Sequence, residues 1–230
     1  MAEFINNIQS QFYVTFIYEN RWSFFLDGLG MTLLLTLCSF IFGTLIGALL
    51  CVLKSSNKKR LIKFTDAVVS VFIQLPTMVL LMIFVYIIFG DTSLPVTLVV
   101  IFGLTIKSGC YLYDIFYSAV CVVDPGEKEA ARTLGMTKLQ TFANVTLPQT
   151  IKTVIPVYKN QFVSTLQETS VVGYLAVMDL TRASDIVSSR TFSALFALLS
   201  ITIIYLIIGW TVGAFINSFA NKKHLGGENV

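Results

Sequence analysis

The sequence predicts an all-α integral membrane protein with five transmembrane helices and a short cytoplasmic helix. Of its 230 residues, 55% are hydrophobic and only 13% are charged, and the mean hydropathy is +0.78. Several apolar runs exceed the roughly 18 residues that identify a membrane-spanning helix. Because lipid offers the backbone no hydrogen bonds, each run is expected to satisfy its own peptide groups as a helix.

The apolar runs define five spans and two flanking segments. The spans are expected at about 24–53, 65–89, 95–120, 148–177 and 192–219. The first is longer than a bilayer requires, so part of it is expected to be tilted or interfacial. Residues 1–23 are expected to form an N-terminal interfacial segment, 24–220 a transmembrane domain, and 221–230 a cytoplasmic tail.

Basic residues orient the predicted spans. They gather between the first and second spans, between the third and fourth, and after the fifth, at Lys54, Lys58, Lys59, Arg60, Lys63, Lys128, Arg132, Lys138, Lys222 and Lys223. The opposite loops carry few basic residues, namely Arg21, Arg182 and Arg190. The positive-inside rule therefore places the N-terminus outside and the C-terminus in the cytoplasm.

The fourth predicted span is unusually polar. It contains Pro156 and six polar or charged residues, which are Lys152, Lys159, Asn160, Gln161, Gln167 and Glu168. Charges that face lipid cost several kcal/mol each, so this segment is expected to face protein or a water-filled cavity. The alternative is a helix that begins in the cytoplasm and enters the membrane late.

Between the third and fourth spans, residues 124–138 carry the signals of a short helix and a sharp turn. Asp124 can cap the helix, Pro125 suits its first position, and Glu127 can reach back to the cap. The helix is expected to run to about Leu134, because Gly135 tolerates a left-handed conformation. Residues 137–140 then repeat the start signal.

The surface of this cytoplasmic helix suits a protein partner. Ala130 and Ala131 leave it narrow. Polar contacts around it are expected from Glu127, Lys128, Glu129 and Arg132. A solvated loop helix without a partner explains the same residues, and the local pattern does not decide between the two.

Chemistry by this chain alone is not expected. No phosphate-binding loop of the Gly-x-x-x-x-Gly-Lys-Ser/Thr type is present, so the chain is not expected to hold ATP. His224 is the single histidine, and no cluster of metal ligands or nucleophile with its base is visible. The cysteines Cys38, Cys51, Cys110 and Cys121 are isolated, which indicates packing roles. We expect neither a bound cofactor nor a metal.

The stretch Glu129-Ala130-Ala131-Arg132-Thr133-Leu134-Gly135-Met136, followed by Leu147-Pro148, resembles the EAA loop of ABC-transporter permeases. Other segments resemble the branch that imports polar amino acids of the histidine, glutamine and arginine type. These segments are 28–36, 108–114, 160–162, 168–170, 179–182 and 189–192. The similarity covers most of the chain from about residue 25.

The resemblance implies the transmembrane subunit of a type I ABC importer in the bacterial inner membrane. In that family the EAA loop is the coupling helix, which implies contacts with an ATPase by Glu127, Glu129, Ala130, Ala131, Arg132 and Gly135. The implied partners are two ATP-binding subunits that hold ATP and Mg, a second permease chain, identical or homologous, and an external substrate-binding protein. Membrane lipid and an amino acid substrate complete the set, and no nucleic acid is expected.

Two polar stripes are candidates for the substrate pathway. Lys107, Tyr111 and Asp114 share one face of the third span. The fourth span contributes Gln161, Ser164, Thr165 and Glu168, and the resemblance adds Thr169 and Ser170. Such a cavity offers both charge signs to a zwitterionic amino acid, with the carboxylate near Lys107 and the ammonium near Asp114 or Glu168. The alternative is ion pairing of Lys107 with either acid that holds the helices together.

The chain departs from the family pattern at three positions. Ile73 stands where many members have an arginine, Gln167 where many have a lysine, and Lys107 where a small polar residue is common. A cation has moved to another helix, or this subunit's pocket has lost binding. Two other functions remain open from the residues: an ion-driven secondary transporter that uses Asp114 and Glu168, and a membrane scaffold.

Overall fold

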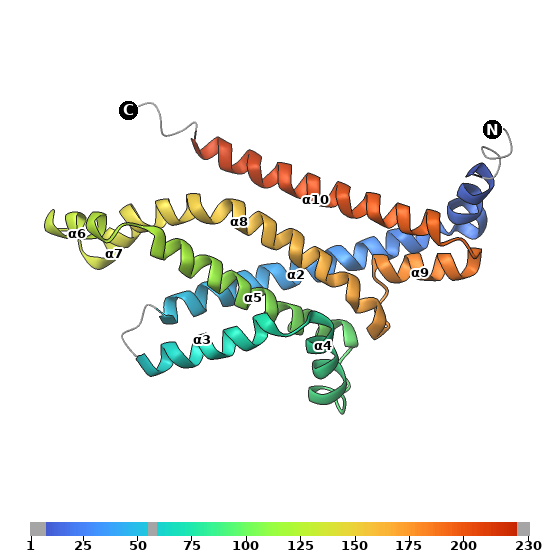
Figure 1. The fold of residues 1–230 in the computed structure, drawn as a ribbon, viewed down its shortest axis with the longest axis horizontal. Helices are drawn as coiled ribbons and strands as arrows, with labels where there is room; N and C mark the ends of the chain where they lie inside the picture. The colour runs from blue at the N-terminus through green and yellow to red at the C-terminus, as the bar shows by residue number, and fades with distance from the viewer. Residues whose placement is uncertain (1–7, 55–58, 225–230) are drawn as a thin grey trace. The chain divides into compact units, whose positions relative to one another are not determined.

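The computed structural model describes residues 8–54 and 59–224. Every regular element within them is a helix (Figure 1). The α-helices are α2 Trp22–Lys54, α3 Lys59–Gln74, α4 Thr77–Met82, α5 Val96–Val122, α6 Pro125–Thr133, α7 Lys138–Thr141, α8 Leu147–Glu168, α9 Leu180–Thr191 and α10 Ala194–His224. Short π- or 3₁₀-helical segments cover Tyr13–Ile17, Tyr18–Asn20, Ile83–Ile88, Phe142–Thr146 and Thr169–Leu175. The predicted all-α class is confirmed.

Length and apolar composition identify α2, α5 and residues Ala194–Ile216 of α10 as possible spans in the described chain. The pair Lys59–Gln74 and Thr77–Ile88, which bends by 105°, is either a fourth, broken span or a re-entrant loop, and it covers the second expected span. Pro76 explains the break, because it has no N–H to donate and disfavours a helical conformation of the residue before it. The polar helix α8 is not among these candidates, and the count of five spans stays a prediction.

Some expectations lie outside the described residues. They concern Lys58 in the first basic cluster, residues 1–7 of the N-terminal segment, and residues 225–230 of the tail.

The chain forms two compact units, and most long helices contribute to both. The first unit comprises Met1–Ser39, Pro76–Leu104 and Ser164–Thr211. One of its apolar clusters is built from α2, α4, α5 and the segment after α8, with Leu35, Leu81, Val100 and Val172 fully buried. A second joins α2, α9 and α10 through Phe25, Leu180, Val187 and Ile201.

Helix α9 is held against α2 by a buried cap. The side chain of Asp179 accepts hydrogen bonds from the N–H groups of Thr181 and Arg182, at 3.1 and 2.9 Å. Burial raises the pKa of Asp179, and the hydrogen bonds from these N–H groups offset only part of that rise. The hydroxyl of Thr32 accepts from the N–H of Leu180 at 3.0 Å. A side chain at Gly28 would lie 2.7 Å from the Asp179 carbonyl oxygen, so this contact requires glycine.

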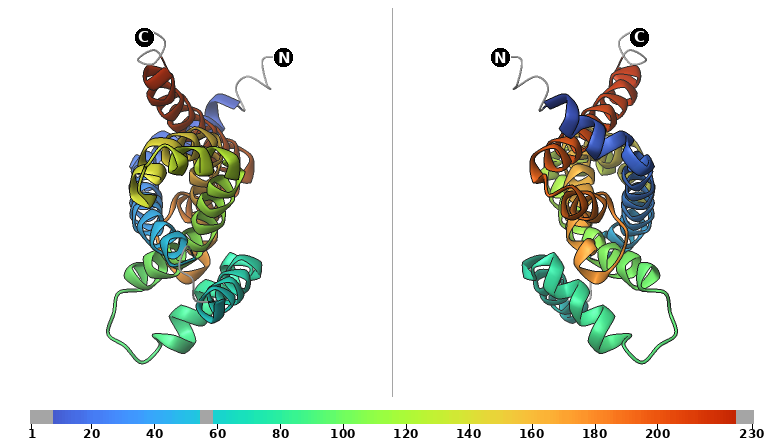
Figure 2. Two further views of the ribbon diagram at one scale, coloured as in Figure 1. Left: turned by 90° about the vertical axis from the view of Figure 1, so that its left-hand side faces the viewer. Right: turned by 90° about the vertical axis from the view of Figure 1, so that its right-hand side faces the viewer.

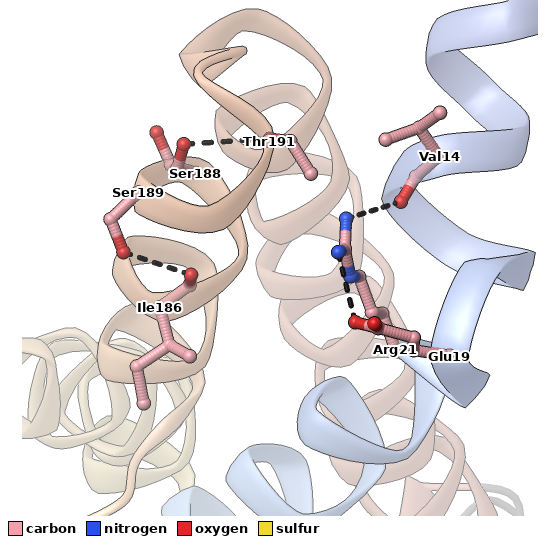
Figure 3. A network of polar contacts seen from close by, with 7 residues as sticks. All are labelled: Val14, Glu19, Arg21, Ile186, Ser188, Ser189 and Thr191. Atoms are coloured by element: carbon pink, nitrogen blue, oxygen red, sulfur yellow. Dashed lines mark hydrogen bonds and ion pairs between the residues drawn. The ribbon is translucent and has the colours of Figure 1, made fainter.

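The N-terminal segment folds around a buried arginine (Figure 3). Arg21 is 6% exposed and donates to the carbonyl of Val14 at 2.9 Å and to the carboxylate of Glu19 at 3.1 Å. Phe16 packs on the apolar cluster that contains α9. Figure 3 also shows the bonds that close the last turn of α9, from Ser189 to Ile186 and from Thr191 to Ser188. The interfacial placement of this segment stays a prediction.

The second unit comprises Phe40–Leu75, Thr105–Val163 and Val212–Val230. In it α2 and α5 approach closely at glycines. A side chain at Gly43 would lie 3.0 Å from the Ser108 hydroxyl, and one at Gly47 would lie 2.9 Å from Leu112 and from the Tyr113 backbone. Gly43 and Gly47 therefore form a Gly-x-x-x-Gly contact of the kind that lets membrane helices pack.

Candidate coupling loop and transport pathway

Helix α6 begins as the sequence predicts. The Asp124 carboxylate accepts a hydrogen bond from the N–H of Gly126 at 2.8 Å, and Pro125 occupies the first helical position. The cap satisfies one of the N–H groups that a helix leaves free, and proline removes another. The predicted cap by Asp124 and the predicted first-position proline are confirmed, whereas the predicted role of Glu127 is not.

The turn after α6 is built around Gly135, which has a φ of +89°. The N–H of Gly135 donates to Arg132 and that of Met136 donates to Ala131, at 3.1 and 3.2 Å. These two bonds are those of a Schellman motif, in which a glycine adopts the left-handed conformation beyond the helix end. The predicted glycine stop is confirmed, and α6 ends at Thr133 with Leu134 as its C-cap.

Helix α7 then begins with a reciprocal capping box. The Thr137 hydroxyl accepts from the N–H of Gln140 at 3.3 Å, and the Gln140 side chain accepts from the N–H of Thr137 at 2.8 Å. The two short helices lie side by side at one end of the second unit (Figures 1 and 2). We name residues 124–141 the coupling loop.

Two side chains attach α6 to the neighbouring long helices. Glu127 was expected to reach back to its own cap, whereas its carboxylate accepts a hydrogen bond from Gln149 on α8. The Lys128 ammonium donates to the carbonyl of Val120 on α5 at 3.3 Å. These two bonds connect α6 to α8 and to the last turn of α5.

The exposed surface of the coupling loop is mixed. Glu129, Ala130 and Arg132 are exposed, as the docking hypothesis requires. Ala131 is 5% exposed and packs within the chain, so Ala130 is the alanine that a partner could reach. The loop also presents Leu134 and Leu139, which are 82% and 77% exposed. Sequence reasoning did not select these leucines, although both flank the predicted glycine corner.

In the predicted pathway, Lys107 and Tyr111 turn toward the broken end of α3. The Lys107 ammonium donates to the carbonyl of Leu75 at 2.8 Å, and the Tyr111 hydroxyl donates to that of Ile73 at 3.3 Å. The last carbonyls of a helix lack intrahelical donors and carry the negative end of its dipole. Lys107, which is 3% exposed, supplies both a donor and a positive charge there.

The three residues of the predicted stripe on α5 differ in their exposure to solvent. Lys107 is buried, Tyr111 is half-buried, and Asp114 is exposed. Helical spacing places all three on one side of α5, but the end of α3 covers its Lys107–Tyr111 part. Gln161 on α8, in the same unit, is half-buried and precedes Phe162 of the apolar cluster with Phe40 and Leu112.

The other predicted pathway residues lie in the first unit, at the end of α8. Thr165 is fully buried, Glu168 is half-buried and Ser164 is exposed. The helix changes from α to 3₁₀ geometry after Glu168, where Thr169 is fully buried and donates to the carbonyl of Leu166 at 2.7 Å. Ser170 is half-buried in this tighter segment.

Residues 39–223 match a family described as the inner membrane component of binding-protein-dependent transport systems. A protein named as a glutamine transport system permease in Rickettsia conorii is 30% identical over 87% of this chain and 92% of its own length. A protein named as an amino-acid permease in Bacillus subtilis is 30% identical over 80% of this chain and 84% of its own.

Two solved structures are also similar to this chain. A crystal structure of an amino acid ABC transporter with histidines is 31% identical, with a TM-score of 0.79 over 87% of this chain and 94% of that one. An inward-facing MetNI methionine ABC transporter is 18% identical, with a TM-score of 0.74 over 90% of this chain and 99% of that one, and shows the fold alone. The chain therefore belongs to the inner-membrane components of binding-protein-dependent transport systems, which confirms the resemblance carried by its coupling loop.

Proposed function

We propose that the chain is the transmembrane subunit of an ATP-driven importer of polar amino acids. The observation that carries this proposal is the coupling loop: two capped helices around a glycine corner, bonded to α5 and α8 and presenting Glu129, Ala130 and Arg132 outward. The named activities of its relatives support the amino acid class.

In this proposal two ATPase subunits dock on residues 125–138 of two permease chains. ATP and Mg are held by those subunits, and this chain has no ATPase site of its own. The exposed leucines Leu134 and Leu139 supply apolar contact area beside the charged side chains of α6. An external binding protein delivers the amino acid, and ATP binding shifts the population between two access states.

The proposed orientation places the N-terminus outside and the C-terminus in the cytoplasm. The distribution of lysine and arginine supports it, because these residues gather in the coupling loop and around the segment between α2 and α3. The loop is then on the side where ATP is available. A reporter fused to the C-terminus and found outside the cell would contradict this orientation.

We propose that the substrate pathway is lined by the two sets of polar residues predicted from the sequence. Lys107, Tyr111 and Asp114 contribute from α5, and Gln161, Ser164, Thr165, Glu168, Thr169 and Ser170 contribute from α8 and the segment after it. The buried charge of Lys107 favours a carboxylate nearby, and the exposed carboxylate of Asp114 is available to an ammonium group.

The experiment that tests the proposal reverses one charge on the coupling loop. Purified Glu129→Lys complex is reconstituted into proteoliposomes with its ATPase and binding protein, and uptake of amino acids and ATP hydrolysis are measured together. We expect uptake to fall about tenfold or more, because one charged docking contact is replaced by repulsion. Asp91→Lys makes the same charge change in the exposed loop before α5 and should leave uptake unchanged.

Normal uptake and normal ATPase stimulation in Glu129→Lys would show that the loop does not dock an ATPase. A wild-type complex that hydrolyses ATP but accumulates none of the polar amino acids would contradict the substrate class instead.

A further inference from the structure

A polar cluster joins three helices of the second unit. The Lys54 ammonium at the end of α2 lies 2.8 Å from the Asp66 carboxylate on α3. The Tyr113 hydroxyl on α5 donates to the same carboxylate oxygen at 2.5 Å. The Lys54 ammonium also lies 3.7 Å from the centre of the Tyr117 ring, which stacks with that of Tyr113. One carboxylate thus connects three helices, and two aromatic rings cover its cation.

The residues of this cluster are partly or fully shielded from solvent, which strengthens their polar interactions. Tyr113 is 2% exposed, and the side chains of Lys54 and Asp66 are 15% and 43% exposed. Hydrogen bonds to charged groups are stronger than neutral ones, and an ammonium over an aromatic ring gains further attraction. Removal of Asp66 would leave a largely buried cation without its counter-ion, which is costly.

Helix α3 is also attached within this unit by Val69, Phe72 and Ile73, which pack in one apolar cluster with residues of α2 and α5. Thr65 and Val69 are its buried residues, and Val69 packs in one cluster with Tyr113. Its large apolar residues Phe64 and Val71 are 68% and 57% exposed. Polar bonds from α5 therefore reach α3 at two levels: Tyr113 bonds Asp66 in its middle, and Tyr111 and Lys107 bond the carbonyls at its C-terminal end.

The helix that carries Tyr113 leads into the coupling loop. Helix α5 ends at Val122, and α6 starts at Pro125. The Lys128 ammonium on α6 also bonds the carbonyl of Val120 in the last turn of α5. Helix α6 is therefore connected to α5 both through the chain and through this hydrogen bond.

We propose that Lys54, Asp66 and Tyr113 form a polar joint, a set of positioning residues that makes α3 follow α5 when the coupling loop moves. This inference rests on the proposed function of the loop. The joint contacts neither ATP nor amino acid. It acts by keeping α3, which ends at the break beside Lys107, in register with the helix that receives the movement.

The test measures amino acid molecules taken up per ATP hydrolysed by the reconstituted complex. Lys54→Gln, Asp66→Asn and Tyr113→Phe should each assemble and hydrolyse ATP while this ratio falls about tenfold for the charged pair and less for the tyrosine. Lys54→Arg keeps the charge and the ring contact and should retain the wild-type ratio. Lys63→Gln removes the same charge from an exposed position of α3 and is the matched control.

A wild-type ratio in assembled Asp66→Asn or Lys54→Gln would overturn the joint while leaving the importer intact. Failure of all three variants to assemble would also overturn it, since the cluster would then serve folding alone. If wild-type complex hydrolyses ATP without amino acid uptake, the proposed function fails. The joint is then judged by whether the same variants lose stimulation of ATPase by the binding protein.

Discussion

The coupling loop and the contact between α3 and α5 are two polar regions of the same unit that are built in opposite ways. In the loop, Asp124, Thr137 and Gln140 bond backbone groups two or three residues away. At the end of α3, Lys107 bonds a carbonyl 32 residues away and Tyr111 one 38 residues away. The first arrangement can be read from neighbouring residues, whereas the second exists because a proline break and a distant helix meet.

The contrast explains why neighbouring residues predict the contacts of the first region and not those of the second. Capping patterns specify a partner atom, because the side chain can reach few backbone groups besides its own. A helical stripe specifies only a direction around the helix. The contacts of such a stripe depend on which element packs against it. On α5, the end of α3 contacts Lys107 and Tyr111 and leaves Asp114 exposed.

The largest expected effect comes from removing the long-range cation. Lys107→Ala should abolish or redirect uptake while the subunits still assemble. It removes a buried charge from the proposed pathway and leaves the Leu75 carbonyl without this donor, at a cost of about 1–3 kcal/mol. Uptake kinetics with several amino acids would check the loss or change of transport. Thermal melting of the complex in detergent would check that the subunits still assemble.

Tyr111→Phe is the matched control, because it removes one weaker neutral bond from the same contact. It should lower both the melting temperature and uptake less than Lys107→Ala does, because it leaves the buried charge of Lys107 in place. Unchanged uptake in Lys107→Ala would exclude the substrate role of Lys107 and leave it as a cap for α3.

A smaller effect is expected where α2 and α5 touch. Gly47→Ala would place a methyl group 2.9 Å from the Leu112 side chain and the Tyr113 backbone, and should destabilise the subunit by about 1–3 kcal/mol. Gly30→Ala is the control on the same helix, since no atom lies within 4 Å of its added methyl group. We expect Gly30→Ala to be neutral or slightly stabilising. Equal melting temperatures for the two variants would argue against the Gly-x-x-x-Gly contact.

The smallest effect on stability is expected in the coupling loop. At Gly135 an added methyl group also meets no atom within 4 Å, so Gly135→Ala tests backbone conformation alone. An alanine at a φ of +89° should cost about 1 kcal/mol and shift the corner between α6 and α7. Melting should change little, while uptake per ATP should fall more than in Gly30→Ala. No change in coupling would mean that the corner tolerates distortion.

The break at Pro76 shows which part of the fold the sequence predicts and which part it does not. Pro76 and Ile73 are visible in the sequence, and Ile73 was noted as a position without the usual arginine. The structure brings Lys107 to the carbonyl of Leu75, two residues from Ile73. The sequence could not predict this contact, because it depends on α3 and α5 packing together, and whether a cation has moved or the pocket has lost binding stays a prediction.

The polar joint was missed for the same reason. Lys54 was counted only as part of a basic cluster, Asp66 received no role, and Tyr113 was noted only within a segment of family resemblance. Asp66 lies 12 residues from Lys54 and 47 residues from Tyr113 in the chain. No local sequence pattern therefore indicates these contacts.

By itself, the sequence determined the helical class, the family and the coupling loop with its caps and glycine corner. These follow from hydropathy over a span length and from side chains that bond their own neighbourhood, both of which are short-range. Tertiary structure alone decided what Lys107, Asp66 and Tyr113 contact, and which of two adjacent alanines is exposed. A buried polar group must find a partner wherever packing places one, and packing brings together residues that lie far apart in the chain.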